Sequence, residues 1–321
     1  MEPTSQLHAG GSSETFRKRP KAMQWEWTPA TCQLHPFHHT QLSKALKEQD
    51  RQIVYIGDSL NTDMANSMRC MMAQTKTDWE STSSFITNIR DDLLGCPPKS
   101  DAAYGTPQYC SNRTEVVQIW RGWVQNFGIH DRDVLVINTG AHWHGTPEAT
   151  AGAFLNIANA ISEVFRGKVV VRTTVMGHEG CENYGDAMDP VANAQITTDS
   201  VAAAASNSDH MPYNWNNFGT LNDLIAKAME ESDLMNYEIL YVDMFEQRPD
   251  GHYQGAPGGS GIDCLHYCVP GPIHWWNKLL YHIIYDTIFS TSMSAKEKHD
   301  EKNTTISFLT NGTGTRDVKS K

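Results

Sequence analysis

Short apolar runs alternate along this chain with longer segments whose apolar residues recur at helical spacing. Four runs have the composition of buried strands: Ile53–Ile56, Val134–Ile137, Lys168–Val171 and Glu238–Val242. The helical pattern covers residues 61–73, 116–127, 147–166, 221–235 and 273–289. Thr146 and Pro147 supply the cap and the first residue of the third of these helices, and Gly167 its end. This alternation predicts an α/β fold, a parallel sheet with helices on both faces joined by right-handed crossovers.

Two long segments without a clear period interrupt this order, Thr75–Cys110 and Val175–Asn217. They follow the first and third strands, so we expect them at the edge where those strands end, as walls of a ligand cleft. Residues 1–21 are polar and basic, and residues 292–321 are polar without periodicity, which predicts a flexible start and a disordered tail. We expect one catalytic domain between them, over residues 22–291.

The composition limits the class of protein. A chain of 321 residues with 39% hydrophobic residues is long enough to bury a sizeable core. Its formal net charge of −11 argues against a nucleic-acid partner, which a basic face would serve. No run approaches the roughly 18 to 20 apolar residues that cross a bilayer, and no apolar signal-peptide core opens the chain. The sequence as given therefore predicts a soluble protein with no membrane span and no visible secretion signal.

Cysteines and glycosylation sequons point to an oxidising compartment instead. Seven cysteines are many for a reducing compartment, and N-x-S/T sequons occur at Asn112, Asn303 and Asn311, although such tripeptides also arise by chance. A zinc site at Cys264-x-His266-x-Cys268 is a rival interpretation. Its spacing is not that of a C-x2-C knuckle, and no second ligand pair lies elsewhere in the sequence, so we expect no metal.

A serine, a histidine and an aspartate lie in positions typical of a nucleophilic site. Ser59 follows the first apolar run and precedes a helix, at the carboxyl end of a strand and beside a helix N-terminus. Asp263 and His266 are three residues apart, so in a helical turn or tight loop the carboxylate can orient the imidazole. That imidazole is the base that a serine hydroxyl needs. A serine at such a position is more often a helix cap than a nucleophile. Here the Asp263–His266 block follows Ser59 in the chain order of a catalytic triad, which favours catalysis.

Several blocks resemble, in order, the motifs of one known family. They are Trp25-Glu26-Trp27-Thr28-Pro29 with Cys32, Leu34 and Phe37; Gly57-Asp58-Ser59-Leu60 with Cys70; Asn138-Thr139-Gly140-Ala141-His142-Trp143; Val170–Cys181; Arg248–His252; and Asp263–Gly271 with Trp276–Tyr281. The family is the trichome-birefringence-like and PMR5 group of the GDSL/SGNH superfamily, also called PC-esterase domains. The resemblance covers roughly residues 22–290.

The resemblance implies a three-layer SGNH-like, flavodoxin-like fold with long active-site loops and a Ser59–His266–Asp263 triad. It implies an O-acetyltransferase that moves acetyl groups onto polysaccharide hydroxyls in the secretory lumen, in the Golgi or after secretion. The partners are then a carbohydrate acceptor and an acetyl donor as co-substrate, with no further cofactor. Implied disulfides join Cys181 to Cys264 and Cys32 to Cys268; Cys96 and Cys110 are close enough to close a local loop, and Cys70 stays unpaired.

Residues next to the strand ends are candidates for oxyanion or substrate contacts: Gly57, Asp58, Asn138, Gly140, His142 and Trp143. The Ser59 N–H is the main oxyanion donor, with Asn138 or Gly140 as helpers, and the alternative for Asn138 is an ordinary turn residue. His142 and His144 are bases or ligands in one interpretation and packed or rim residues in the other. Candidates for sugar stacking, or for the core, are Trp143, Trp215, Trp275 and Trp276.

The chain also departs from the family pattern. Plant members usually follow GDSL with Arg-Asn and then Gln, where this chain has Thr62-Asp63-Met64. It lacks the upstream cysteines and membrane anchor that usually precede the Trp-rich block, which indicates an incomplete N-terminus or a divergent relative. Two alternatives to a transferase remain: a carbohydrate acetyl esterase, in which water takes the acyl group from Ser59, and a glycan-binding protein without turnover.

Overall fold

The computed structural model describes residues 33–73, 84–96, 110–143, 145–178, 181–184, 186, 217–242, 251–254 and 262–289. Several predictions lie outside these residues. They concern the Trp-rich block, the bond from Cys32 to Cys268, His144, Trp215, the sequons at Asn303 and Asn311, and both ends of the chain.

The central sheet of the described residues has five parallel strands in the order β2-β1-β3-β4-β5. The strands are β1 (Ile53–Gly57), β2 (Ile86–Arg90), β3 (Val134–Ile137), β4 (Lys168–Arg172) and β5 (Tyr237–Leu240). The chain winds outward in opposite directions from β1 and β3, so the crevice at their carboxyl ends is where an open α/β sheet binds its ligand. The predicted parallel α/β fold is confirmed, and the architecture is consistent with an SGNH-like three-layer fold.

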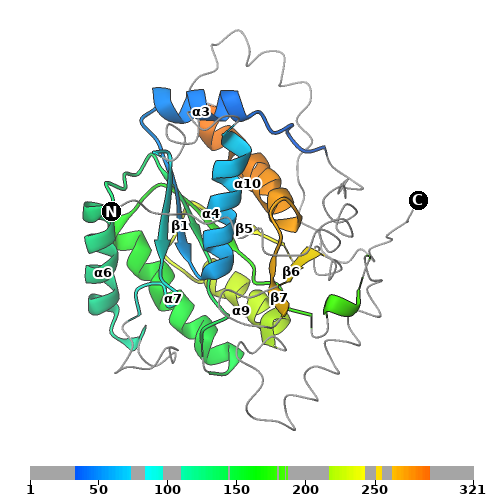
Figure 1. The fold of residues 1–321 in the computed structure, drawn as a ribbon. Coiled ribbons are helices and arrows are strands. Elements are labelled where there is room, and N and C mark those ends of the chain that lie inside the picture. Colours follow the sequence, from blue (N-terminus) through cyan, green and yellow to red (C-terminus); the bar gives the residue numbers. More distant parts are fainter. Residues whose placement is uncertain are drawn as a thin grey trace, which may run out of the picture.

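Helices cover both faces of this sheet (Figure 1). On one face lie α3 (His39–Glu48), α4 (Ser59–Met72) and α10 (Pro272–Phe289); on the other lie α6 (Arg113–Asn126), α7 (Pro147–Val164) and α9 (Phe218–Glu230). Side chains alternate along β1, so Ile53 and Tyr55 pack toward α4 and α10 while Val54 and Ile56 pack toward α6 and α7. A strand buried on both faces needs a continuous apolar run, which is what β1 and β3 have.

Helix α7 begins as predicted and ends earlier than predicted. The Thr146 side chain accepts a hydrogen bond from the Ala149 N–H at 3.2 Å, and Pro147 opens the helix. The helix ends at Val164, so the assignment of its end to Gly167 is wrong. Gly167 serves a close approach instead: a Cβ there would lie 2.5 Å from the Asp131 carbonyl oxygen.

The segment Thr75–Cys110 is not irregular throughout, because it contains β2. Among the described strands, β2 pairs with β1 alone and lies at the edge of the sheet, and of its residues Ile86 and Ile89 are buried. An edge strand tolerates polar residues such as Thr87 and Asn88, and these hide its strand pattern. Helix α3 also had no counterpart among the predicted elements. No helix of the described residues is long and apolar enough to span a membrane.

Candidate active site

The turn from β1 into α4 places Ser59 at the first position of a helix. Gly57 ends the strand with a φ of +154°, and a Cβ there would lie 2.6 Å from the Asn138 carbonyl oxygen. Only glycine fits this close approach without displacement of β3. Asp58 then caps α4, because its Oδ1 accepts hydrogen bonds from the N–H groups of Leu60 at 3.0 Å and Asn61 at 3.3 Å.

The N–H of Ser59 is left available at this helix start. The Asp58 carboxylate serves the next two N–H groups, and no described residue accepts a hydrogen bond from the Ser59 N–H. A free N–H at a helix N-terminus is a donor for a developing oxyanion. Ser59 itself is half-buried, and no described residue makes a hydrogen bond to its Oγ in this state. Catalytic contacts of this kind often tighten only when substrate is bound.

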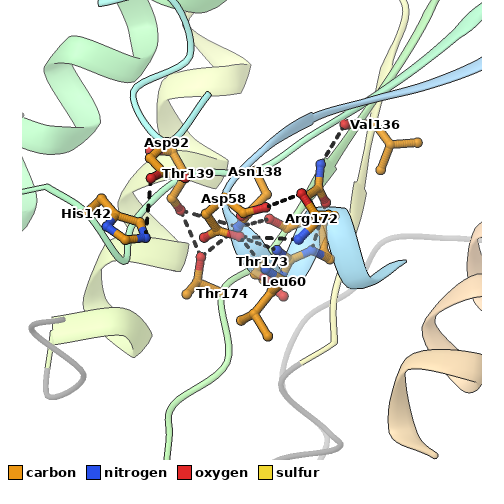
Figure 2. A network of polar contacts seen from close by, with 12 residues as sticks. Asp58, Leu60, Asp92, Val136, Asn138, Thr139, His142, Arg172, Thr173 and Thr174 are labelled. Carbon is orange, nitrogen blue, oxygen red and sulfur yellow. Dashed lines mark hydrogen bonds and ion pairs between the residues drawn. The ribbon is translucent and has the colours of Figure 1, made fainter. Parts of the chain in front are cut away.

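A buried arginine, Arg172, forms an ion pair with Asp58 of this turn (Figure 2). Arg172, at the end of β4, is 1% exposed, and its Nη2 lies 3.5 Å from Asp58 Oδ1. Its Nε donates to Asn61 Oδ1 at 3.2 Å, its Nη1 donates to the Thr173 carbonyl at 2.8 Å, and the guanidinium lies 5.2 Å from the Trp276 ring centre. Burial lowers the pKa of Arg172 to about 10 and Asp58 opposes this fall, so the side chain is charged at neutral pH. The ion pair fixes Asp58 in the orientation that caps α4.

Asn61 connects the same turn to the two central strands. Its Nδ2 donates to the carbonyl oxygens of Ile56 at 3.0 Å and Val136 at 2.9 Å. Neither Asn61 nor Arg172 is among the sequence candidates. Arg172 is a charged residue at the end of a strand that is buried throughout, and such a residue needs a buried partner. This position in the sequence could have identified Arg172 as a site residue.

Asp263 and His266 meet within a bulged strand. Strand β7 (Ile262–Tyr267) pairs antiparallel with β6 (His252–Gln254), with His252 opposite Tyr267 and Gln254 opposite Ile262. Two steps along β6 therefore match five along β7, and the three extra residues bulge out. The expected helical turn or tight loop is wrong, because the segment is a strand with a bulge.

The bulge folds around the Asp263 carboxylate. Its Oδ1 accepts from the N–H groups of Leu265 at 2.9 Å and His266 at 3.0 Å, and its Oδ2 lies 2.8 Å from His266 Nδ1. Burial opposes the charge on Asp263, but the hydrogen bonds from His266 outweigh it and hold the Asp263 pKa well below its usual range. Burial likewise lowers the pKa of His266, and the bond and charge of Asp263 reverse this and raise it. The carboxylate thus places the proton on Nδ1 and leaves Nε2 to act as a base.

The charges of this pair act on the first turns of α4. Asp63, one helical turn after Ser59, has its pKa raised to about 6 by burial; the charge of His266 lowers it, and those of Asp263 and Asp58 raise it. Residues four apart share one face of a helix, so the face that carries Asp63 also carries Ser59. His266 therefore lies within electrostatic reach of the helix face that presents Ser59.

Two of the expected oxyanion helpers lie at the end of β3. The Asn138 Nδ2 donates to Thr174 Oγ1 at 2.8 Å, so as it lies this amide serves another side chain. Its buried Oδ1 accepts no hydrogen bond from any described residue. Gly140 has a φ of +144°, and a Cβ there would lie 3.0 Å from the same Thr174 Oγ1. Both residues border the site, and their part in oxyanion binding stays a prediction.

His142 and Trp143 both contact Asp92, which follows β2, and Figure 2 shows His142 beside Asp92. His142 Nε2 is 3.6 Å from Asp92 Oδ2, and burial lowers the His142 pKa while Asp92 opposes the fall. Trp143 is 3% exposed, and its Nε1 donates to the Asp92 carbonyl at 3.2 Å. As it lies, the Trp143 ring belongs to the core under α6 and α7 and offers no face to a sugar. Trp276 is fully buried as well, and Lys278 Nζ covers Trp275 at 3.8 Å from the ring centre.

Two disulfides lie in the described residues, and both are expected pairs. Cys181–Cys264 has a Cα–Cα distance of 5.5 Å and ties the short helix η2 (Cys181–Asn183) to β7; Cys96–Cys110 has a Cα–Cα distance of 5.0 Å. Cys70 is a free, exposed cysteine. Nowhere in the described ranges do three or more His, Cys, Asp or Glu side chains gather as metal ligands.

Comparison with known proteins relates part of this site to a family. Residues 145–283 match the PC-esterase family model, a GDSL/SGNH-like acyl-esterase family found in Pmr5 and Cas1p. This range contains Asp263 and His266 and begins after Ser59. No solved structure matches the chain.

Curated relatives extend the similarity across most of the chain. It is 23% identical to trichome birefringence-like protein 9 of Arabidopsis thaliana, over 83% of this chain and 73% of that protein. Trichome birefringence-like protein 34 of the same plant is 24% identical, over 82% and 74% of the two chains. Xyloglucan O-acetyltransferase 2, also from Arabidopsis thaliana, is 23% identical over 81% and 72%. Residues 145–283 thus match the PC-esterase family, and the chain is similar over most of its length to proteins of the trichome-birefringence-like group.

Proposed function

We propose that this chain is a serine-dependent O-acetyltransferase that moves an acetyl group onto a carbohydrate hydroxyl. The observation that carries the proposal is the 2.8 Å contact between Asp263 and His266, set against the helix start that presents Ser59. The relatives add the reaction class, because they include a xyloglucan O-acetyltransferase. The relatives support polysaccharide acetylation in general, and we propose Ser59 as the nucleophile of that reaction.

In the first half-reaction, His266 takes the proton of the Ser59 hydroxyl while Oγ attacks the acetyl carbonyl of the donor. The Ser59 N–H holds the oxyanion of the tetrahedral intermediate, and Asp263 stabilises the imidazolium. The bond between the acetyl group and the donor then breaks. The leaving group takes the proton from His266, and acetyl-Ser59 remains.

In the second half-reaction, a sugar hydroxyl gives its proton to His266 and attacks acetyl-Ser59. The ester to Ser59 breaks, Oγ recovers the proton from His266, and the acetylated sugar leaves. If water attacks instead, the same residues make an esterase. The family description as acyl-esterases favours that second candidate.

The cellular setting is also a proposal. Disulfides persist in oxidising compartments, and Cys181–Cys264 and Cys96–Cys110 support a place in the secretory lumen, such as the Golgi, or outside the cell. We propose that the catalytic unit spans residues 22–291.

The test is a competition between sugar and water. The purified chain is incubated with 4-nitrophenyl acetate, with and without xyloglucan oligosaccharides, and products are read by mass spectrometry. We expect acetylated oligosaccharide to increase with acceptor concentration at the expense of free acetate, and Ser59→Ala to form neither. Rapid release of acetate with no acetylated acceptor at any concentration would show an esterase instead. Binding of the oligosaccharide without turnover would show a glycan-binding protein.

A further inference from the structure

Two buried histidines outside the triad connect directly to its backbone. His178, after β4, is 2% exposed, and His252, at the start of β6, is 4% exposed. Their Nδ1 and Nε2 atoms, respectively, lie 2.7 Å apart. The other nitrogen of His252, Nδ1, lies 2.8 Å from the carbonyl oxygen of His266.

The contacts fix which nitrogen carries each proton. A carbonyl oxygen accepts only, so His252 Nδ1 carries a hydrogen and donates to His266. A neutral imidazole then has a bare Nε2, which must accept from a hydrogen on His178 Nδ1. Burial lowers the pKa of His252 to about 3; the charge of His178 lowers it further, while the bond to the His266 carbonyl and the charge of Asp263 raise it. His252 is therefore neutral at ordinary pH, with Nδ1 as the donor and Nε2 as the acceptor.

The histidine pair occupies a gap in the strand pairing. A bulge leaves backbone groups of the longer strand without ladder partners, and the His266 carbonyl belongs to such a bulge. The His252 side chain supplies the donor that the bulged ladder lacks at this carbonyl. Its ring also stacks on Tyr267, with 4.2 Å between ring centres.

Further contacts fix the backbone both before and after His266. The His178 N–H donates to the Cys264 carbonyl at 2.8 Å, and the Cys181–Cys264 disulfide joins the same two segments. The Cys268 N–H donates to the Gly251 carbonyl at 2.8 Å. The backbone is thus held two residues before and two residues after His266, and the His252 side chain holds it at His266 itself.

We propose that His252, with its tautomer set by His178, is a positioning residue that fixes the His266 backbone so that the imidazole serves Asp263 and Ser59 together. This inference rests on the proposed function for its kinetic consequence. Its structural consequence, the alignment of His266 with Asp263, is independent of which acyl group or acceptor the enzyme uses.

The test compares side chains that keep or lose the donor. His252→Phe keeps a ring on Tyr267 and removes both nitrogens, whereas His252→Asn places an amide N–H near the position of Nδ1. His178→Phe removes the donor to His252 Nε2, and His178→Asn restores one. His274→Phe is the matched control, because His274 on α10 makes its side-chain hydrogen bond to Ser67 of α4, with 3.0 Å from Nδ1 to Oγ. If His252→Phe does not fold, His252→Gln, whose amide lies near Nε2 rather than Nδ1, takes its place.

Two readouts separate positioning from mere stability. A fluorophosphonate probe counts reactive Ser59, so that kcat for 4-nitrophenyl acetate is expressed per active site. Proton NMR follows the titration of the His266 ring, assigned by its loss in His266→Asn. We expect His252→Phe to lower kcat per site roughly 10- to 100-fold with KM within about twofold, and to lower the His266 pKa toward its ordinary value. His252→Asn recovers most of both, and the control changes neither.

The proposal is overturned if His252→Phe leaves the His266 titration and the kcat per site unchanged and only reduces the folded fraction. An equal loss in His252→Phe and His252→Asn also overturns it, since the donor then has no importance. If the wild-type chain shows no Ser59-dependent turnover, the proposed function fails, and the NMR titration alone decides whether His252 positions His266.

Discussion

Asp263 and His266 stand three residues apart on one strand, and yet the Oδ2 of the first lies 2.8 Å from the Nδ1 of the second. In a regular strand, residues three apart point to opposite faces. The β7 bulge, folded around the Asp263 carboxylate, is what brings them to one side. The same contact raises the pKa of His266, which links the local backbone to the acid–base behaviour of the site.

Asp263→Asn should lower kcat about 10³-fold or more, because the amide no longer orients and charges the imidazole. With the carboxylate gone, the His266 pKa falls, so the acid limb of the pH–rate profile shifts to lower pH. Asp233→Asn, on an exposed ion pair with Arg113, is the control and should leave both unchanged. A pH profile with the same acid limb in both variants would contradict the assignment of His266 as the base.

The Asp263–His266 pair also makes stability depend on pH. The raised His266 pKa stabilises the fold below the ordinary histidine pKa and this contribution is lost as pH rises through the folded value. The lowered Asp263 pKa stabilises the fold above the ordinary aspartate pKa and is lost only in strong acid. Asp263→Asn should therefore cost more free energy of unfolding near pH 5.5 than near pH 9, by on the order of 1 kcal/mol, measured by urea unfolding.

Asp63→Asn should increase the free energy of unfolding, whereas Asp263→Asn decreases it. The Asp63 pKa is raised to about 6 by burial and the nearby carboxylates, so ionised Asp63 destabilises the fold. The variant should be more stable than wild type by about 1 kcal/mol at pH 8 and close to it near pH 3, below the ordinary aspartate pKa, where the carboxyl is mostly neutral in the folded and the unfolded state. Urea unfolding at the two pH values decides this, and a variant less stable at pH 8 would show that the Asp63 charge is favourable.

Gly57→Ala should destabilise the protein by about 1 to 3 kcal/mol, because the new methyl meets the Asn138 carbonyl at 2.6 Å and the backbone has a positive φ. Acyl transfer should fall with it, since the turn carries Ser59. Gly152→Ala, in helix α7 with nothing within 4 Å of its Cβ, is the control and should stabilise by about 0.5 to 1 kcal/mol. Thermal unfolding of the two variants should move in opposite directions; equal shifts would refute the tight turn at Gly57.

Arg172→Met should cost about 3 to 5 kcal/mol, because it leaves the Asp58 carboxylate buried without its charge partner. Asp58→Asn keeps a capping side chain for α4 and removes that charge. The double variant should therefore be more stable than Arg172→Met alone, as measured by urea unfolding. Strictly additive losses would mean that the 3.5 Å ion pair contributes no coupling.

Local patterns in the sequence were sufficient for much of the sheet. β1 and β3 are continuous apolar runs, and Thr146 and Pro147 mark the start of α7 by cap chemistry. β2 was not predicted because an edge strand needs little hydrophobicity. Its place beside β1 depends on pairing between residues 33 positions apart in the sequence.

The site was predictable only in part, because its geometry comes from contacts between distant segments. Asp263 and His266 were paired by spacing, but the bulge that joins them depends on β6. Arg172 ends a buried strand and so needs a buried partner, but its sequence position does not say that Asn61 is one. His178 and His252 look ordinary in the sequence until the fold brings them together. Trp143 was predicted as a possible sugar contact, and whether an indole ring is covered depends on the helices packed over it.

The most direct test of the account is to find the acyl group on Ser59. The chain is mixed with 4-nitrophenyl acetate, quenched in acid within the first turnover, digested and sequenced by mass spectrometry. We predict acetyl on the peptide from the start of α4, at Ser59, which disappears when oligosaccharide is added before the quench and never forms in Ser59→Ala. Turnover without an acetylated Ser59, or undiminished turnover in Ser59→Ala, would contradict the serine mechanism.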